Sequence, residues 1–257
     1  MSDRSILDIS NLTIKFGGVT AVDDVTLSVR SGSVTSIIGP NGAGKTTVFN
    51  MISGIYKPTS GNIVFDGQEV AGHKQHEISK RGIARTFQNI RLYDGLSVLE
   101  NVQTVLDART DYNIFQALLR LPGTRKKDKQ NVSTCEEYLD LVGLLEFKDS
   151  KPTSLPYGLQ RKLEIARALA ASPKLLLLDE PAAGLNTVEV DELIELIGLI
   201  KAKYDLTILL IEHRLQLVYT LSEYVYVLNF GGLLAEGTPK EIQNNAEVIA
   251  AYMGEDD

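Results

Sequence analysis

A glycine-rich segment carries the strongest chemical pattern in this sequence. The stretch IIGPNGAGKTTVF fits G-x-x-x-x-G-K-[ST] at Gly39, Gly44, Lys45 and Thr46. We expect a buried strand before it, at residues 34–38, and a helix after it. Glycines let such a loop curl its backbone amides toward phosphate oxygens, and the new helix adds partial positive charge there. The segment therefore predicts a site for the phosphates of a nucleoside triphosphate.

The residues of this phosphate loop have separate expected roles. Lys45 places a full positive charge on the β- and γ-phosphates, and the Thr46 hydroxyl is a ligand for Mg²⁺. A glycine-rich turn that binds nothing is the alternative, but strand, motif and helix all argue against it. The residues expected to bind the nucleotide in this loop are Gly39, Pro40, Asn41, Gly42, Ala43, Gly44, Lys45, Thr46 and Thr47.

Two adjacent carboxylates follow a run of four leucines in KLLLLDEPAAGLN. In an open parallel sheet, ligands bind at the carboxyl ends of the strands, where Asp179 and Glu180 would lie. Two carboxylates at the end of a buried strand are costly unless a cation or a hydrogen-bond network holds them. We expect Asp179 to face Mg²⁺ and Glu180 to polarise the attacking water. A solvated strand end is the alternative.

A histidine repeats this arrangement one strand later, in LTILLIEHRL. His213 comes just after an apolar strand, where its side chain would reach a γ-phosphate, although a lone histidine is more often structural or exposed. Gln88, in ARTFQNIRLY, follows a short strand-like stretch, and an exposed loop glutamine is its default interpretation.

The elements that position these residues change along the chain. Strand patterns with turn signals fill the first third, including two strands joined by a Ser-Gly turn in VTLSVRSGSVTSIIG and a pairing across Asp-Gly in GNIVFDGQEV. Helical patterns follow from about residue 95 to 165, opened by a capping box of Ser97 and Glu100. After residue 165, helices and strands alternate, which predicts a mostly parallel sheet covered by helices.

The helical stretch holds two segments of weaker pattern. DYNIFQALLRL is a short amphipathic helix candidate that ends before Pro122. The basic stretch GTRKKDKQN follows and is interpreted as an exposed, solvated connector. Contact of its basic residues with anionic lipid headgroups is the less favoured alternative; these residues are Arg125, Lys126, Lys127 and Lys129.

Composition narrows the class of protein. The 257 residues are 44% hydrophobic and 23% charged, enough for a packed core in one large domain or in one with a subdomain. The formal net charge is -7 with a pI of about 5.1. This acidic balance argues against a nucleic-acid partner. The single cysteine permits no internal disulfide, and we expect neither a signal peptide nor a membrane span.

Together these motifs resemble the nucleotide-binding subunits of ATP-binding-cassette (ABC) transporters. The order is shared over almost the whole chain: phosphate loop, TFQ, helical insert, LLLLDEP and IEH. The resemblance implies an α/β P-loop NTPase cassette with a RecA-like parallel-sheet core, an amino-terminal antiparallel β subdomain and a helical subdomain. As a single domain over 1–257, it would have its core at about 1–95 and 166–235, the helical subdomain at about 96–165 and a carboxyl-terminal extension at about 236–257.

The resemblance also assigns roles. Phe16 looks like the aromatic that stacks on adenine, and Gln88 like the loop glutamine that meets Mg²⁺ and transmits contact from membrane subunits. Glu180 matches the catalytic carboxylate, and His213 matches the γ-phosphate sensor. AAGLN is similar to the loop that crosses the dimer interface, with Asn186 where many members have aspartate.

The segment LPYGLQ resembles the family signature, commonly Leu-Ser-Gly-Gly-Gln, which binds the ATP of the partner subunit. Proline, tyrosine and leucine replace its serine, first glycine and glutamine, so the anion would meet helix-start amides, the helix dipole and nearby Arg161. This shared site would then be the weaker one of a heterodimer. The signature positions are Leu155, Pro156, Tyr157, Gly158, Leu159 and Gln160.

The pattern is more similar to the ATPases of branched-chain amino acid importers. The stretches GIARTFQNIRLYDGLSVLENV and LLAEGTPKEIQNNAEVIAAYMGE carry that likeness. It implies a homologous ATPase partner, two membrane permeases, an external binding protein and a peripheral location on the cytoplasmic face of the membrane. Urea or amide importers and lipopolysaccharide exporters share much of the pattern. Disfavoured classes are a cassette acting on ribosomes or DNA, a scaffold without hydrolysis, and a GTP switch.

Overall fold

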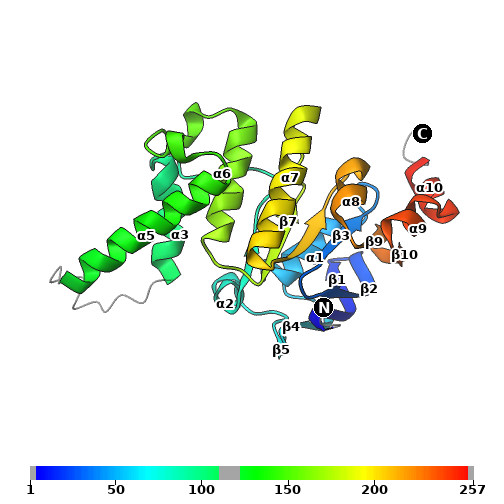
Figure 1. Cartoon of the computed structure of the whole chain (residues 1–257). Helices are drawn as coiled ribbons and strands as arrows, with labels where there is room; N and C mark the ends of the chain where they lie inside the picture. The colour runs from blue at the N-terminus through cyan, green and yellow to red at the C-terminus, as the bar shows by residue number, and fades with distance from the viewer. Residues whose placement is uncertain (1–3, 110–121, 254–257) are drawn as a thin grey trace. The chain divides into compact units, whose positions relative to one another are not determined.

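The computed structural model describes residues 4–109 and 122–253, which divide into two units (Figure 1). The first unit contains the chain up to residue 88 together with the chain from residue 174 onward. The second unit is the segment 89–173 between them. Each unit has buried side chains of its own.

An antiparallel sheet begins the first unit. Its strands are β1 (Ser5–Phe16), β2 (Val19–Arg30), β4 (Ser60–Phe65) and β5 (Gln68–Glu69), in the order β2-β1-β4-β5. The pairing expected across the Asp-Gly turn is confirmed as β4 with β5, and both turn residues have positive φ.

A six-stranded sheet follows in the same unit. In the order β10-β9-β3-β8-β7-β6, every neighbouring pair is parallel except β9 with β10, so the mostly parallel sheet is confirmed. Both strands expected in VTLSVRSGSVTSIIG exist, but β2 and β3 belong to different sheets and do not form a hairpin. Its strands are β3 (Val34–Ile38), β6 (Ile83–Arg85), β7 (Leu175–Asp179), β8 (Thr207–Ile211), β9 (Tyr224–Asn229) and β10 (Gly232–Gly237).

Side-chain alternation gives this sheet two different apolar faces. On β9, Tyr226 and Leu228 pack with the antiparallel sheet and α1, whereas Val225 and Val227 pack with the last helices of the chain. Both faces are buried, which explains why β7 and β8 read as continuous apolar runs rather than alternating ones. The helices of this unit are α1 (Lys45–Ile52), α2 (Gln75–Arg81), α7 (Thr187–Tyr204), α8 (Leu215–Leu221), α9 (Pro239–Gln243) and α10 (Ala246–Met253).

The register of the central strands brings three chain segments to one edge. β8 lies between β3 and β7, and Ile211 at its end pairs with both Ile37 and Asp179. Because these strands are parallel, their carboxyl ends meet at the same edge of the sheet. The loops that follow each strand are therefore neighbours, although they are far apart in sequence.

The second unit is helical. It contains α3 (Val98–Arg109), α5 (Pro122–Leu141), α6 (Tyr157–Leu169) and two short 3-10 turns, η1 (Leu145–Phe147) and η2 (Pro152–Ser154). The capping box is confirmed, because the Ser97 amide donates to Glu100 over 2.7 Å and the Glu100 amide to Ser97 Oγ over 3.2 Å.

One sequence interpretation of this unit is wrong. The stretch GTRKKDKQN belongs to α5 and is not a connector. Lys, Arg and Gln have high helix propensity, and they continue the amphipathic pattern of the following segment, whose Leu139 is buried. The candidate helix DYNIFQALLRL falls outside the described residues.

Charged and polar side chains are buried in the second unit without a sequence signal for burial. Arg161 and Glu164 form an ion pair of 2.8 Å with about 1% of each side chain exposed. Cys135 is also buried, and desolvation, helped by Asp107 and Glu136, raises the pKa of its thiol to about 12.

Across residues 4–109 and 122–253, no helix combines the length and the apolar character needed to cross a membrane.

Candidate functional site

The phosphate loop connects β3 to α1 through backbone shapes that require glycine. Gly39 has φ 145°, and a Cβ there would come within 2.0 Å of the Leu228 carbonyl oxygen. Gly44 caps α1 with φ 97°, and its Cβ would meet the Ala21 carbonyl oxygen at 2.7 Å. The loop is thus packed tightly against β9 and β2, which fixes its curvature.

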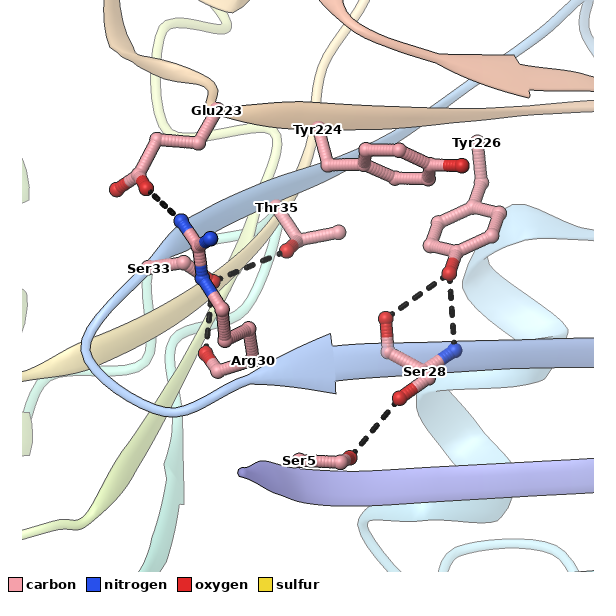
Figure 2. A pocket seen from close by; sticks show the side chains of 8 residues that line it. All are labelled: Ser5, Ser28, Arg30, Ser33, Thr35, Glu223, Tyr224 and Tyr226. Atoms are coloured by element: carbon pink, nitrogen blue, oxygen red, sulfur yellow. Dashed lines mark hydrogen bonds and ion pairs between the residues drawn. The ribbon is translucent and has the colours of Figure 1, made fainter. Parts of the chain in front are cut away.

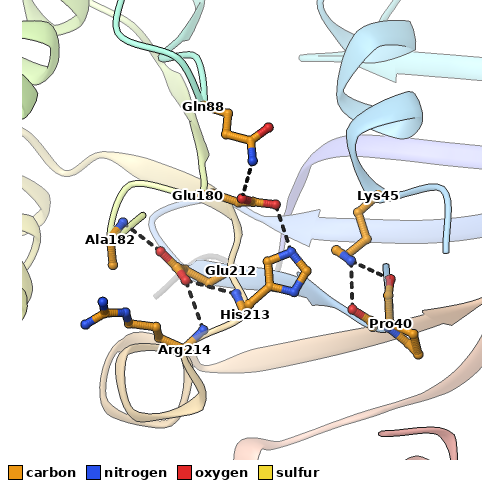
Figure 3. A network of polar contacts seen from close by, with 9 residues as sticks. Pro40, Lys45, Gln88, Glu180, Ala182, Glu212, His213 and Arg214 are labelled. Atoms are coloured by element: carbon orange, nitrogen blue, oxygen red, sulfur yellow. Dashed lines mark hydrogen bonds and ion pairs between the residues drawn. The ribbon is translucent and has the colours of Figure 1, made fainter. Parts of the chain in front are cut away.

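Lys45 is the cation of this loop. Its side chain is buried, and Nζ donates to the carbonyl oxygens of Gly39 and Pro40, both over 2.7 Å (Figure 3). The backbone carbonyl groups of the loop therefore hold the Lys45 ammonium inside the turn. Thr46, in the first turn of α1, is exposed, and Thr47 is half-buried. The loop presents Asn41 and Gly42 to solvent and buries Ala43.

Asp179 ends β7 in a buried ion pair. Its Oδ2 accepts from the Arg85 guanidinium over 2.8 Å, and only 2% of the aspartate side chain is exposed. Arg85 also donates over 2.8 Å to Asn50 and Ser53 on the side of α1. A buried carboxylate needs such compensation for its lost hydration. Arg85 was not singled out from the sequence; its only signal is a basic residue at the end of a short apolar strand.

Glu180 lies between Gln88 and His213 and forms hydrogen bonds with both. Gln88 Nε2 donates to one carboxylate oxygen over 2.7 Å, and His213 Nε2 lies 2.8 Å from the other (Figure 3). Glu180 is 13% exposed and His213 37%. The glutamate adopts a left-handed φ of 47°, and its amide donates to the Ile211 carbonyl over 2.9 Å. The structure thus brings together three residues that the sequence places in separate motifs.

This arrangement has the chemistry of a general base with two orienting partners. A partly exposed carboxylate can accept a proton from water, while an amide and an imidazole fix its direction. The histidine can also donate a hydrogen bond to a phosphate oxygen, depending on its tautomer. The group therefore suits activation of a water molecule beside the phosphate loop.

Glu212, the residue before His213, was missed by the sequence interpretation. Its carboxylate is 2% exposed and accepts the backbone amides of Ala182, His213 and Arg214 over 2.7 to 3.0 Å. The signal that would have found it is its place directly after a buried strand, because an acidic residue there must find hydrogen-bond donors.

Phe16 lies at the end of β1 and is 44% exposed. It packs edge-on against Tyr56, with ring centroids 5.1 Å apart at 71°. Tyr56 is a second exposed aromatic that the sequence interpretation missed. The pair offers an aromatic surface suited to a flat base.

The signature segment lies in the second unit at the start of α6. Pro156 is the N-cap, and its carbonyl accepts the amides of Leu159 and Gln160, both over 3.0 Å. The expectation that these amides await an anion is therefore wrong for these two residues. Arg161 is also unsuited to that role, because its buried guanidinium pairs with Glu164.

The remaining signature residues divide by exposure. Pro156 and Tyr157 are exposed, whereas Leu155 and Gly158 are buried. Gln160 turns back, and its Nε2 donates to the Leu155 carbonyl over 2.9 Å, which braces the entry to the helix. The surface offered to a partner is thus the first turn of α6 with its dipole.

The donor set at the sheet edge fits Mg²⁺ by type. Thr46 supplies a hydroxyl, Gln88 an amide carbonyl and Asp179 a carboxylate, and hard oxygen ligands are those that Mg²⁺ prefers. Arg85 holds one Asp179 oxygen, so the carboxylate already has a fixed direction. The described part of the chain has no cluster of three or more His, Cys, Asp or Glu side chains that could hold a metal by itself. A Mg²⁺ ion here would need phosphate oxygens as further ligands.

A hollow of about 270 Å³ lies at the opposite end of the parallel strands from the phosphate loop (Figure 2). Its charged groups, Arg30 and Glu223, pair with each other, and Ser33 donates to the Arg30 carbonyl. Tyr226 exchanges hydrogen bonds with the backbone of Ser28. These polar groups form hydrogen bonds and an ion pair with one another, so we assign no ligand to this hollow.

Comparison with known families identifies the site at the carboxyl ends of the parallel strands. The family model described as ABC transporter matches residues 22–183, more than half of the chain. This chain belongs to the ABC transporter family. It is an ATP-hydrolysing cassette of that family. A second family model, described as branched-chain amino acid ATP-binding cassette transporter, matches residues 233–257 of this ABC cassette.

Several curated proteins resemble the cassette over nearly their full length. The high-affinity branched-chain amino acid transport ATP-binding protein BraF of Pseudomonas aeruginosa is 44% identical over 252 residues, covering 98% of this chain and 99% of the relative. LivG of Escherichia coli, which has the same description, is 43% identical with the same coverage. The lipopolysaccharide export ATP-binding protein LptB of Escherichia coli is 35% identical, covering 97% and 98%.

Solved structures of cassettes share the fold. An ATP-binding cassette of an ABC transporter in its ADP conformation has a TM-score of 0.85 at 32% identity, covering 98% of this chain and 99% of that one. A dimeric cassette bound to ADP and phosphate in a post-hydrolysis state has a TM-score of 0.76 at 26% identity, covering 91% and 98%.

Proposed function

We propose that this ABC cassette powers the import of branched-chain amino acids. The observation that carries the proposal is the convergence of the phosphate loop, Asp179, Glu180 and His213 at one sheet edge. The substrate class rests on the relatives named for branched-chain amino acid transport and on the family match over residues 233–257.

In this proposal the chain's own residues share the work of hydrolysis. The phosphate-loop amides and Lys45 hold the phosphates, and Phe16 with Tyr56 receives the adenine. Glu180 takes the proton of the attacking water, while Gln88 and His213 hold its carboxylate in place. Phosphoryl transfer needs positioning and charge neutralisation more than covalent chemistry. Thr46, Gln88 and Asp179 would hold Mg²⁺, which neutralises charge on the β- and γ-phosphates.

Assembly completes the proposed machine. The first turn of α6 faces the ATP of a homologous subunit, and closure of the dimer around ATP drives two membrane permeases. An external binding protein delivers the amino acid to those permeases, and the cassette is peripheral on the cytoplasmic face of the membrane. The solved dimer with ADP and phosphate supports pairing of such cassettes.

Export of lipopolysaccharide is the second candidate, because LptB is also similar over nearly the full chain. The carboxyl-terminal match over residues 233–257 favours the amino acid importer. The two candidates predict the same chemistry at Glu180 and differ only in the permeases that the cassette drives.

Purification of the tagged full-length chain from its own membranes tests the proposal. We expect two permeases to copurify, and the complex in proteoliposomes to hydrolyse ATP faster with a leucine-loaded binding protein than with the empty one. Urea should not replace leucine. A complex that transports no leucine, isoleucine or valine would remove the substrate claim while leaving the ATPase intact.

A further inference from the structure

Two loops that carry the proposed catalytic groups are joined by one buried carboxylate. Glu180 leads into residues 181–186, and His213 is the second residue of the loop after β8, which begins at Glu212. Glu212 Oε1 accepts the Ala182 amide over 2.7 Å, and Oε2 accepts the amides of His213 over 2.9 Å and Arg214 over 3.0 Å (Figure 3). Each carboxylate oxygen therefore serves a different loop.

The geometry points to Glu212 as a positioning residue that holds Glu180 and His213 in register. The inference rests on the proposed roles of those two residues. The carboxylate is 2% exposed, so its bonds to three amides form away from competing water. The Arg214 guanidinium adds a second tie by donating to the Leu185 carbonyl. The distance between the base and the histidine thus depends on this clamp, defined here as Glu212 and Arg214.

The clamp also reaches the segment AAGLN, which resembles the loop that crosses the dimer interface. Ala182 and Leu185 lie in that segment, and both are tied to the loop that carries His213. A shift of His213 toward or away from a phosphate therefore transmits to the segment that would meet the partner subunit. The clamp is a mechanical link between phosphate sensing and dimer contact.

A single-atom change separates the two halves of the clamp. Glu212→Gln keeps the length and volume of the side chain, but an amide has one acceptor oxygen and places an N–H donor group where the other oxygen was. One loop must then lose its anchor. Glu212→Asp keeps both oxygens on a shorter stem, and Glu195→Gln makes the same chemical change at an exposed position on α7.

ATPase kinetics of the full-length chain measure the effect. For Glu212→Gln we expect kcat to fall about 10-fold with KM for ATP within about 2-fold of wild type, because the phosphate loop is untouched while the register between Glu180 and His213 is lost. Glu212→Asp should recover part of kcat, and Glu195→Gln should match wild type. In a His213→Ala background, Glu212→Gln should cost about 2-fold or less, since there is no histidine left to position. An equal loss in both backgrounds would show an ordinary structural role.

Hydrogen exchange tests the clamp without any activity. In Glu212→Gln, at least one of the peptides covering residues 181–186 and 213–215 should exchange faster than in wild type or Glu195→Gln, because the amide anchors only one of the two loops. Unchanged exchange in both peptides overturns the inference. If Glu180→Gln and His213→Ala leave the ATPase rate at the wild-type value, the proposed function of the site fails instead. If those two variants are impaired while Glu212→Gln behaves like Glu195→Gln, only the clamp is wrong.

Discussion

At the scale of single residues, Glu180 combines an unfavourable backbone with a central position. A non-glycine residue at φ 47° costs about 1–3 kcal/mol when its surroundings impose that shape. The bond from its amide to Ile211, and the contacts of its carboxylate with Gln88 and His213, are what hold it there. This conformation aims the carboxylate away from β7 and toward the loop of His213.

Replacing the proposed base tests that role directly. For Glu180→Gln we expect ATP affinity near wild type and an ATPase rate lower by about 10²-fold or more, because an amide cannot accept the proton of water. Equilibrium binding of a fluorescent ATP analogue and phosphate release measure the two quantities. Glu195→Gln on the exposed face of α7 is the matched control. A rate close to wild type would move the base to another residue.

The signature helix permits a gain-of-function test. Pro156 has neither an amide proton nor a hydroxyl, so a serine there would add a donor and a stronger N-cap for α6. We expect Pro156→Ser to raise the ATPase rate or to tighten ATP-dependent dimerisation, measured by phosphate release and by light scattering. Unchanged values for both would mean that the helix dipole and the existing amides suffice.

Site residues at the ends of buried strands could be predicted from the sequence, whereas the residues that hold them or their loops in place could not. Asp179, Glu180 and His213 stand out because a polar group after an apolar strand has few structural explanations. Arg85 and Glu212 obey the same rule, but their partners are backbone amides and groups distant in sequence. Sequence patterns carry no information about which distant amide a carboxylate will meet.

At the scale of elements, the start of β9 is tied down by charge. Glu223 pairs with Arg30 at the end of β2 and, over 2.9 Å, with Lys201 on α7. Burial raises the pKa of this carboxyl, but the bonds from Lys201 and Arg30 outweigh it, so the net pKa lies below the ordinary 4.5. The Glu223 carboxylate therefore links the start of β9 to β2 and to α7.

This link predicts an acid-sensitive contribution to stability. A lowered folded-state pKa gives stability that is present above the unfolded pKa and is lost as pH falls through the folded value. The difference in unfolding free energy between wild type and Glu223→Gln should be constant near neutral pH and shrink below about pH 4.5. Urea unfolding at several pH values measures it, with Glu195→Gln as control. A difference that grows on acidification would contradict the assignment.

Element prediction failed where local pattern and long-range packing disagree. The basic stretch in α5 resembles a connector, yet residues with high helix propensity extend a helix that continues to the buried Leu139. The Ser-Gly turn after β2 looks like a hairpin turn, but every residue of β3 is buried and the strand pairs inside the parallel sheet instead.

At the scale of the whole molecule, ATP should stabilise the folded chain through its phosphate loop. Binding to the native state alone adds about 2.7 kcal/mol at a ligand concentration 100 times Kd. We expect a rise in thermal unfolding temperature with ATP that Lys45→Met abolishes, since the substitution keeps the stem and removes the charge. Lys203→Ala, on the exposed side of α7, should retain the rise. A rise of equal size in Lys45→Met would exclude the loop as the binding site.

The architecture of the whole chain was more predictable than its details. Alternating helices and strands after residue 165 indicate a parallel sheet, because right-handed crossovers leave few other arrangements. Which strand joins which sheet depends on which apolar faces pack together. On β9, for example, Tyr226 and Val225 belong to different apolar clusters on opposite sides of the strand. Residue patterns define the faces of each strand but do not define their partners.

The single cysteine makes this chain ready for site-specific labelling. Cys135 is buried in the helical unit, and its raised pKa, about 12, leaves it almost entirely in the unreactive thiol form at neutral pH. A cysteine introduced at an exposed position would therefore be the preferred target of a maleimide dye or spin label, with the native residue left in place. Tyr157→Cys at the start of α6 would put such a reporter where the partner subunit is proposed to close.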